Sequence, residues 1–331
     1  MTFIEHSCHL ALAPVVSRPL PRHARLNDCS EADEGHRVEG DEDHMTLNIS
    51  VATRALAVQT SDFRLTYAGT AQIRSSSAQK QVVLHYRDWS GLLCYTGIAE
   101  AGNHNTAEWL GRVLSHKPGN RSMKEVVDQI QSKGSVWLKR ISASQRHHTF
   151  TLLAYSNQIP HIYTISNFQS LRGPDLPVPA DQLFVSHVRI RGVECFVTGQ
   201  KSATDEDEIA DLADEMSRRR TPKALRAHAA NVSRKAAMRS QDLVSESCVS
   251  SHMLPDGSGE AQVFGNIDDV FIPSLIVNGM DTAPVGPEAL KQSGLPTKAR
   301  MVGATWSKNN QAAVMLVALR PLANQVGSGW E

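Results

Sequence analysis

The stretch that decides the fold is Thr46-Leu-Asn-Ile-Ser-Val-Ala-Thr-Arg-Ala-Leu-Ala-Val-Gln-Thr-Ser-Asp-Phe-Arg-Leu-Thr66. Apolar and polar residues alternate from Leu47 to Val51, which is typical of a half-buried strand. The Ala-Leu-Ala-Val run that follows favours a second strand, ending at Asp62 and buried on both faces. Asp62 comes 16 residues after Thr46, which leaves room for two short strands and a tight turn. The stretch therefore predicts a hairpin that brings Asp62 back beside Thr46.

Strands and helices occur in separate blocks along the rest of the chain. We expect a strand pair over residues 82–97, two helices over 105–133, strand pairs over 148–198, two helices over 204–239 and strands up to residue 277. Helices that are segregated from antiparallel hairpins predict an α+β domain. Two central sheets between two helix pairs, a four-layer αββα sandwich, fit this order.

Capping residues mark the expected helix boundaries. Ser122 is expected to begin one helix and Gly134 to end it. Thr204 with Asp207 is typical of a capping box, which would place the start of a third helix at Thr204.

Both ends of the chain differ from this central block, which we place at residues 45–280. Residues 1–44 combine five histidines with acidic residues and have no sustained period, so we expect this segment to be disordered, propeptide-like or untranslated. Its His6-Ser-Cys8-His9 matches no standard zinc pattern, and we expect no metal and no cofactor. Residues 281–331 are expected to form a short C-terminal extension that includes one strand or short helix near 312–318.

Composition narrows the classes of function. The chain has 331 residues, a formal net charge of zero and 41% hydrophobic residues, so no global charge favours nucleic acid or a membrane surface. Its 5 cysteines are irregularly spaced, as reduced thiols are, and no apolar run approaches the length of a membrane span. We therefore expect a cytoplasmic protein that binds neither nucleic acid nor membrane.

Thr46 and the Asp62-x-Arg64 that follows it resemble the opening of a proteasome-type β subunit, which is an N-terminal nucleophile (Ntn) hydrolase. The resemblance covers roughly residues 46–280 and is strongest over 46–115. It implies the αββα architecture and a threonine peptidase that hydrolyses peptides or proteins without a cofactor. It further implies a homo-oligomeric ring and an ATP-dependent unfoldase as a partner.

The chemistry of such a peptidase depends on a free N-terminal threonine. A threonine hydroxyl needs a base, and an N-terminal threonine has one in its own α-amine, whose pKa is about 8. An amide nitrogen is not basic, so Thr46 is reactive only if Met45 is absent. Self-processing relatives usually have Gly before the threonine, whereas His44-Met45 precedes it here. Translation from Met45 and removal of that residue would expose Thr46 without self-cleavage.

The resemblance assigns the other roles. Lys80, which comes 34 residues after Thr46, matches the lysine that supports the nucleophile together with Asp62, and Arg64 would brace the loop. Gly97 matches the residue whose N–H binds the oxyanion. The first specificity pocket would be lined by Leu65, Tyr95 and Ala99 and would favour modest apolar side chains.

Each assignment has a plainer alternative. Lys80 could be a surface lysine at a strand edge, Asp62 and Arg64 a charged turn, and Gly97 the end of a strand. If Thr46 is never a free N-terminus, the same residues are scaffold, and the protein is a non-catalytic proteasome-like binding module.

Overall fold

The structure is a computed structural model that describes residues 46–66, 73–75, 78–101, 104–218, 220–240, 243–266, 274–281, 299–309 and 312–321. All of these residues belong to one compact unit. Residues 1–45 and most of 282–331 lie outside the described residues, so the expected disorder of 1–44 stays a prediction. Among the described residues, no helix is long and apolar enough to cross a membrane.

The predicted hairpin forms the middle of the first of two seven-stranded sheets. In spatial order, the first sheet contains β12 (Glu194–Gly199), β1 (Leu47–Ala52), β2 (Ala57–Asp62), β13 (Cys248–Met253), β14 (Gly259–Phe264), β17 (Ala299–Asn309) and β18 (Ala312–Pro321). The turn between β1 and β2 lacks glycine, and the Thr53 side chain closes it. Its hydroxyl oxygen accepts hydrogen bonds from the N–H groups of Ala55 at 3.1 Å and Leu56 at 3.2 Å.

The second sheet is antiparallel except at one strand. In spatial order it contains β11 (Phe184–Arg189), β10 (Ile159–Ser166), β9 (His148–Ser156), β6 (Trp89–Gly97), β5 (Gln81–Tyr86), β15 (Ser274–Val277) and β16 (Met280–Asp281). Only the β15–β5 pair of this sheet is parallel in the described part of the chain. Two short ribbons complete the strands: β3 (Leu65–Thr66) with β4 (Ile73–Ser75), and β7 (Glu100–Ala101) with β8 (His104–Asn105).

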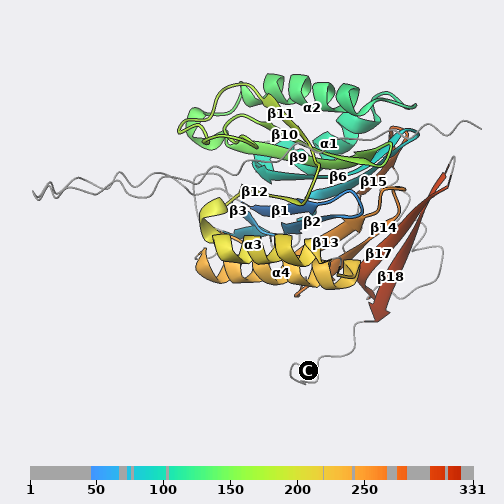
Figure 1. The fold of residues 1–331 in the computed structure, drawn as a ribbon. Helices are drawn as coiled ribbons and strands as arrows, with labels where there is room; N and C mark the ends of the chain where they lie inside the picture. The colour runs from blue at the N-terminus through green and yellow to red at the C-terminus, as the bar shows by residue number, and fades with distance from the viewer. Residues whose placement is uncertain are drawn as a thin grey trace, which may run out of the picture. The chain divides into compact units, whose positions relative to one another are not determined.

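Each sheet is covered by one helix pair, as Figure 1 shows. The pair α1 (Thr106–Ser115) and α2 (Met123–Leu138) contacts the second sheet, and the pair α3 (Glu206–Ser217) and α4 (Pro222–Arg239) contacts the first. Short 3-10 turns, η1 (Ala143–Gln145) and η2 (Lys201–Ala203), precede β9 and α3. The two sheets contact each other through β1, β2, β12 and β13 on one side and β6 and β9 on the other. The α+β class predicted from the sequence is confirmed.

Apolar side chains are buried in three clusters. One includes Leu110, Val126 and Phe150 and lies between α1, α2 and the second sheet. Another, with Leu153 and Trp306, lies between the sheets, and the third, with Ile49 and Ala229, lies between the first sheet and α3 and α4. Burial of apolar surface on both faces of both sheets supplies the main stabilisation of the domain.

Two expected helix boundaries were wrong. The helix α2 continues through Gly134 to Leu138. Gly134 allows close packing rather than ending the helix: an added Cβ would lie 2.5 Å from Cδ1 of Leu183. The N-cap of α3 is Asp205, whose carboxylate accepts a hydrogen bond from the Asp207 N–H at 2.8 Å. The Thr204 hydroxyl donates instead to the Lys201 carbonyl at 2.7 Å.

The described part of the expected C-terminal extension continues the first sheet. Strands β17 and β18 form a hairpin, and β17 pairs with β14 so that Trp306 lies opposite Gly259. Residues 312–321 are a strand, which was one of the two structures expected for this segment.

Candidate active site

The hairpin brings Thr46 and Asp62 together as the spacing predicted. Leu47 N–H donates to Oδ1 of Asp62 at 3.1 Å, so the start of β1 is held to the end of β2. Thr46 and Asp62 are both buried, and Asp62 has no exposed surface. Spacing along the sequence predicts this contact because the contact is local and the register of β1 and β2 fixes it.

The Asp62 carboxylate is surrounded by hydrogen-bond donors. Its Oδ2 accepts from the main-chain N–H of Arg64 at 2.9 Å and of Ser245 at 3.0 Å, while its Oδ1 accepts from Leu47 and from Lys80. Ser245 lies in the segment between α4 and β13, so the carboxylate joins three separate parts of the chain. A buried carboxylate with this many donors is held in one orientation.

Lys80 lies at the centre of the site. Its Nζ donates to Thr46 Oγ1 at 2.6 Å, to Asp62 Oδ1 at 3.2 Å and to the carbonyl oxygen of Arg64. An ammonium has three N–H donors, and these three acceptors match them. The Lys80 and Asp62 side chains are both 0% exposed, so Lys80 is not the surface lysine of the plainer alternative.

Two opposing effects act on the proton of Lys80. Burial lowers the pKa of its amine from the usual 10.5, and the charge and hydrogen bond of Asp62 oppose this shift. The nearby Arg64 charge lowers the pKa further. Asp62 is therefore the main group that opposes the lowering of the Lys80 pKa by burial.

A glycine adjoins the main chain of Thr46. Gln200 N–H donates to the Thr46 carbonyl at 3.2 Å, and Gly199 precedes it at φ +86°. A Cβ on Gly199 would lie 1.7 Å from the Thr46 oxygen, so no other residue fits here without displacing Thr46.

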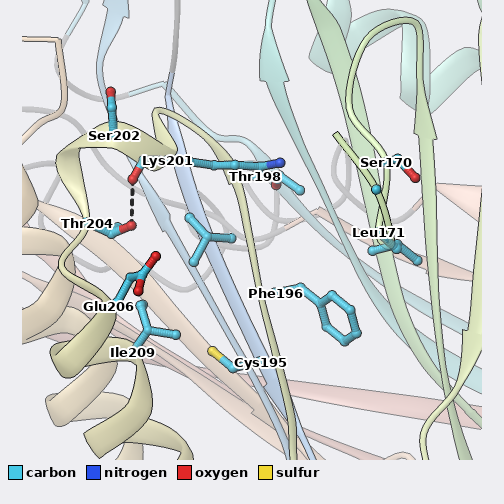
Figure 2. Close-up of a pocket in the computed structure, with 12 residues that line it drawn as sticks. Ser170, Leu171, Cys195, Phe196, Thr198, Lys201, Ser202, Thr204, Glu206 and Ile209 are labelled. Atoms are coloured by element: carbon cyan, nitrogen blue, oxygen red, sulfur yellow. Dashed lines mark hydrogen bonds between the residues drawn. The ribbon is translucent and has the colours of Figure 1, made fainter. Parts of the chain in front are cut away.

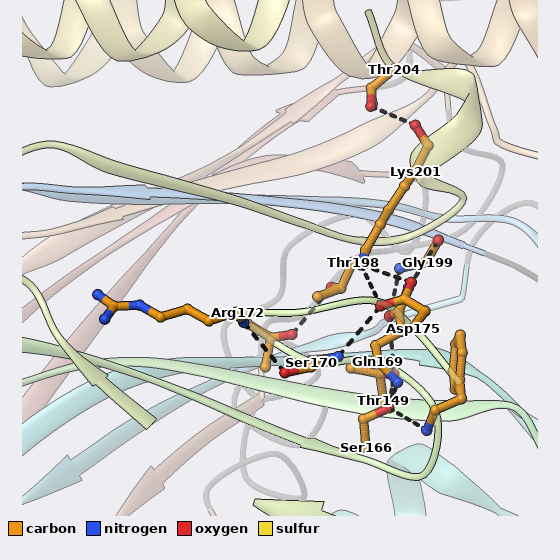
Figure 3. Close-up of polar contacts among 12 residues, drawn as sticks. Thr149, Ser166, Gln169, Ser170, Arg172, Asp175, Thr198, Gly199, Lys201 and Thr204 are labelled. Carbon is orange, nitrogen blue, oxygen red and sulfur yellow. Dashed lines mark hydrogen bonds and ion pairs between the residues drawn. The ribbon is translucent and has the colours of Figure 1, made fainter. Parts of the chain in front are cut away.

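The side chain of Gln169 holds Gly199 in place. Its amide oxygen accepts from Gly199 N–H at 3.1 Å, and its amide nitrogen donates to Gly199 O at 3.2 Å. Thr149 donates to the same amide oxygen at 3.1 Å. Figure 3 shows this group together with the Lys201–Asp175 ion pair, in which Nζ lies 2.8 Å from both carboxylate oxygens. These contacts tie the loop after β10 to the segment that follows β12.

The expected oxyanion donor, Gly97, ends β6 in the same region. Its φ is +89°, and its partner across the ladder is His148. The side chain of Thr96 lies 3.0 Å from the position of a Cβ on Gly199, which itself contacts Thr46. The end of β6 therefore approaches the Thr46 region. That the Gly97 N–H donates to the oxyanion stays a prediction.

The three residues expected to line a specificity pocket are all buried. Leu65 is 9%, Tyr95 3% and Ala99 8% exposed, and all three belong to the cluster between the second sheet and helices α1 and α2. They expose little surface to a substrate. Their role in binding stays a prediction.

A cavity of about 600 Å³ lies along β12, beside the site. Figure 2 shows its lining residues on both sides of the strand, with Leu171 and Phe196 on one side and Ile209 and Cys195 on the other. Thr198, which also lines it, pairs with Asn48 of β1, two residues from Thr46. No pattern in the sequence indicated this cavity.

Sequence reasoning also missed Ser245, Gly199 and Gln169. Each acts through contacts between segments far apart in the chain: Ser245 and Asp62 are separated by 183 residues. The Thr-Gly pair at residues 198–199, at the end of a predicted strand, was the one available signal. Among the described residues, no group of three or more His, Cys, Asp or Glu side chains could hold a metal ion.

Comparisons with known proteins give a weak likeness. No model of a protein family matches the chain, and no curated protein does. Among solved structures, Anbu (ancestral beta-subunit) from Yersinia bercovieri is 16% identical, with a TM-score of 0.42 over 63% of this chain and 82% of that one. An Anbu (Gly-1) mutant from Hyphomicrobium sp. strain MC1 is 14% identical, with a TM-score of 0.39 over 63% of this chain and 81% of that one.

These comparisons correct the family assignment. The sequence pattern led us to expect a proteasome β-subunit-like Ntn hydrolase, and that assignment is wrong: the similar structures are Anbu proteins, and no family model matches. A likeness this weak identifies neither a family nor an activity.

The close contact at Gly199 can be tested with a single methyl group. Gly199→Ala should lower the free energy of unfolding by roughly 3 kcal/mol or more, because the new Cβ meets the Thr46 carbonyl and φ is positive. Gly192→Ala is the control, since a Cβ there has nothing within 4 Å. Urea denaturation measures both variants, and equal stabilities would contradict the described packing.

The buried amine of Lys80 predicts a pH dependence of stability. Because its pKa is lowered in the folded chain, the unfolded chain binds more protons between that lowered pKa and 10.5. The free energy of unfolding should therefore rise with pH through this window, by at most about 1.4 kcal/mol per pH unit. Lys80→Met should lack this rise.

The measurement is urea denaturation of both chains from pH 7 to pH 10.5. Lys124→Met is the control, because the Lys124 side chain is 78% exposed and its loss should not change the slope. A constant or falling difference between the wild-type chain and Lys80→Met would show that Lys80 is not held as described.

Proposed function

We propose that the domain is an N-terminal threonine hydrolase that cleaves peptide bonds, with Thr46 as nucleophile and its own α-amine as base. The observation that carries this proposal is the 2.6 Å hydrogen bond from buried Lys80 Nζ to Thr46 Oγ1. A threonine hydroxyl in contact with a buried ammonium is primed to lose its proton. We also propose that the two sheets and two helix pairs form a four-layer αββα sandwich that presents Thr46 at the start of β1.

The reaction begins with proton transfer within Thr46. Once Met45 is absent, the free α-amine accepts the proton of Oγ1, and Oγ1 attacks the carbonyl carbon of the substrate amide. The negative charge moves to the carbonyl oxygen. When the C–N bond breaks, the leaving amine takes the proton from the α-ammonium, and an ester to Thr46 remains. Water then attacks the ester, its proton passes through the same amine to Oγ1, and the acid product leaves.

Lys80 and Asp62 support these steps without bonding to substrate. The positive charge of Lys80 stabilises the developing Oγ1 anion and lowers the pKa of the adjacent α-amine, which keeps more of that amine neutral. Asp62 fixes the position and charge of Lys80 through the 3.2 Å ion pair. The N–H of Gly97 would donate to the oxyanion, and Leu65, Tyr95 and Ala99 would contact a modest apolar side chain of the substrate once the site opens.

The energetics favour this proposal over a purely structural role. Removing an ammonium and a carboxylate from water costs several kcal/mol per ion, and apolar residues of similar size often stabilise a fold as well. A buried pair in contact with a hydroxyl is therefore typical of a functional site. Assembly into a homo-oligomer and delivery of substrate by an ATP-dependent unfoldase are part of the same proposal.

Hydrolysis of fluorogenic peptide amides tests the mechanism. Protein that begins at Thr46 should cleave peptides with small apolar residues before the scissile bond, and protein that retains residues 1–45 should not. Thr46→Ala should abolish turnover, and Lys80→Ala should lower kcat/KM by roughly 10²–10³-fold or more. Asp62→Asn should lower both turnover and stability, because Lys80 would lose its charged partner.

Thr60→Ala is the matched control. Thr60 is also a buried threonine of the hairpin, but its hydroxyl contacts Ser250 at 2.7 Å rather than Lys80. Its loss should leave kcat unchanged in folded protein. If folded protein that begins at Thr46 cleaves none of the peptides, the catalytic proposal fails and a scaffold role remains.

A further inference from the structure

The strand β12 is one of the two edge strands of the first sheet among the described residues, and the cavity follows its outer side. Cys195, Phe196, Val197 and Thr198 all line the cavity. The side chains of Cys195 and Val197 pack against the cluster beneath α3, whereas Phe196 packs against the cluster between the sheets. The cavity therefore wraps around the free edge of the strand rather than opening on one face.

Two hydrogen bonds show which peptide groups of β12 face the cavity. The N–H of Gln200 points inward to Thr46 O, and the N–H of Gly199 points outward to Gln169. In an antiparallel pair these directions alternate with every residue. The N–H and C=O groups of Val197 and Cys195 must therefore point outward, away from β1 and into the cavity.

Gln169 already occupies the first position of an added strand. Its side-chain amide exchanges both hydrogen bonds with Gly199, as the main chain of a neighbouring strand would. The next outward-facing positions, Val197 and Cys195, are spaced about 6.8 Å apart, the repeat of every second residue in a strand. One main-chain N–H donor and one C=O acceptor of β12 recur at this spacing. The main chain of an extended polypeptide has acceptors and donors at the same spacing and can pair with them.

The walls around this edge match an extended peptide. The loop that carries Ser170 and Leu171 forms one wall, and the start of α3, with Glu206 and Ile209, forms the other (Figure 2). Apolar side chains lie on both sides of β12, where alternate side chains of an added strand would point. The Lys201–Asp175 pair lies beyond Gly199, so the groove is bounded at that end (Figure 3).

We propose that this groove binds an extended peptide segment of another protein by strand addition to β12, next to Gln169. The occupant pairs its main chain with Val197 and Cys195, and its successive side chains point in turn toward Leu171 on one side of β12 and toward Ile209 on the other. This inference goes beyond the proposed hydrolase activity and does not depend on it, because binding requires neither a free Thr46 amine nor turnover.

The test measures binding of a defined peptide to the full chain. The probe is a fluorescein-labelled, end-blocked hexapeptide of alternating valine and threonine, and fluorescence anisotropy gives its Kd. Its analogue, N-methylated at all six residues, has the same side chains but no main-chain donors, and it should bind at least tenfold more weakly. Hydrogen exchange at the Val197 and Cys195 amides should slow when the unmethylated peptide binds.

Two proline variants locate the site on the protein. Val197→Pro removes an outward N–H and leaves the inward ladder to β1 intact, so it should weaken binding at least tenfold. Val185→Pro is the matched control on β11, the edge of the second sheet. The Ile190 N–H donates inward to Pro160 there, so the Val185 N–H also points outward, and its loss should leave the Kd unchanged.

The proposal is overturned if the peptide does not bind, or if the N-methylated analogue binds as tightly, since apolar contact alone would then account for binding. Equal effects of the two proline variants would also overturn it. The analogue tests the unaltered protein, so the result does not depend on whether a variant folds.

Discussion

The site depends on the burial of one ammonium group. Lys80 has no exposed side-chain surface, and its Nζ contacts Thr46, Asp62 and Arg64. A charge that is buried without partners is strongly disfavoured, and the amine would lose its proton instead, so a charged Lys80 requires these acceptors to be in place. This requirement fixes the ends of β1 and β2 and the start of β5 relative to one another.

The same requirement extends to distant segments. Ser245, from the segment before β13, helps to fix the orientation of Asp62, because its N–H donates to the carboxylate at 3.0 Å. Thr46 keeps its position because Gly199 allows the main chains to touch, and Gln169 in turn holds Gly199. Both sheets therefore contribute to the placement of one hydroxyl. Gln169 also begins the free edge of β12, so the site and the proposed peptide groove share a boundary.

Sequence alone predicted the local part of this arrangement. Alternation and spacing placed Asp62 beside Thr46, and the resemblance to a proteasome-type β subunit singled out Lys80, which comes 34 residues after Thr46. The α+β class followed from the order of the blocks. Gln169 lies 30 residues from Gly199 in sequence, and no periodic pattern encodes a contact between two sheets. Gly134 was taken for a helix end because its packing against Leu183 is visible only in three dimensions. The family assignment was wrong because a short motif can define a local geometry without showing that the chain belongs to the family in which that motif is found.

The most direct test of the account is covalent labelling of the chain that begins at Thr46 with a peptide epoxyketone. Such a reagent bonds to both the hydroxyl oxygen and the free amine of an N-terminal threonine, so it tests nucleophile and base together. Mass spectrometry should find one adduct, located on Thr46, and none on Thr46→Ala or on protein that retains residues 1–45. Folded protein that begins at Thr46 and remains unlabelled, or labelling at another residue, would contradict the account.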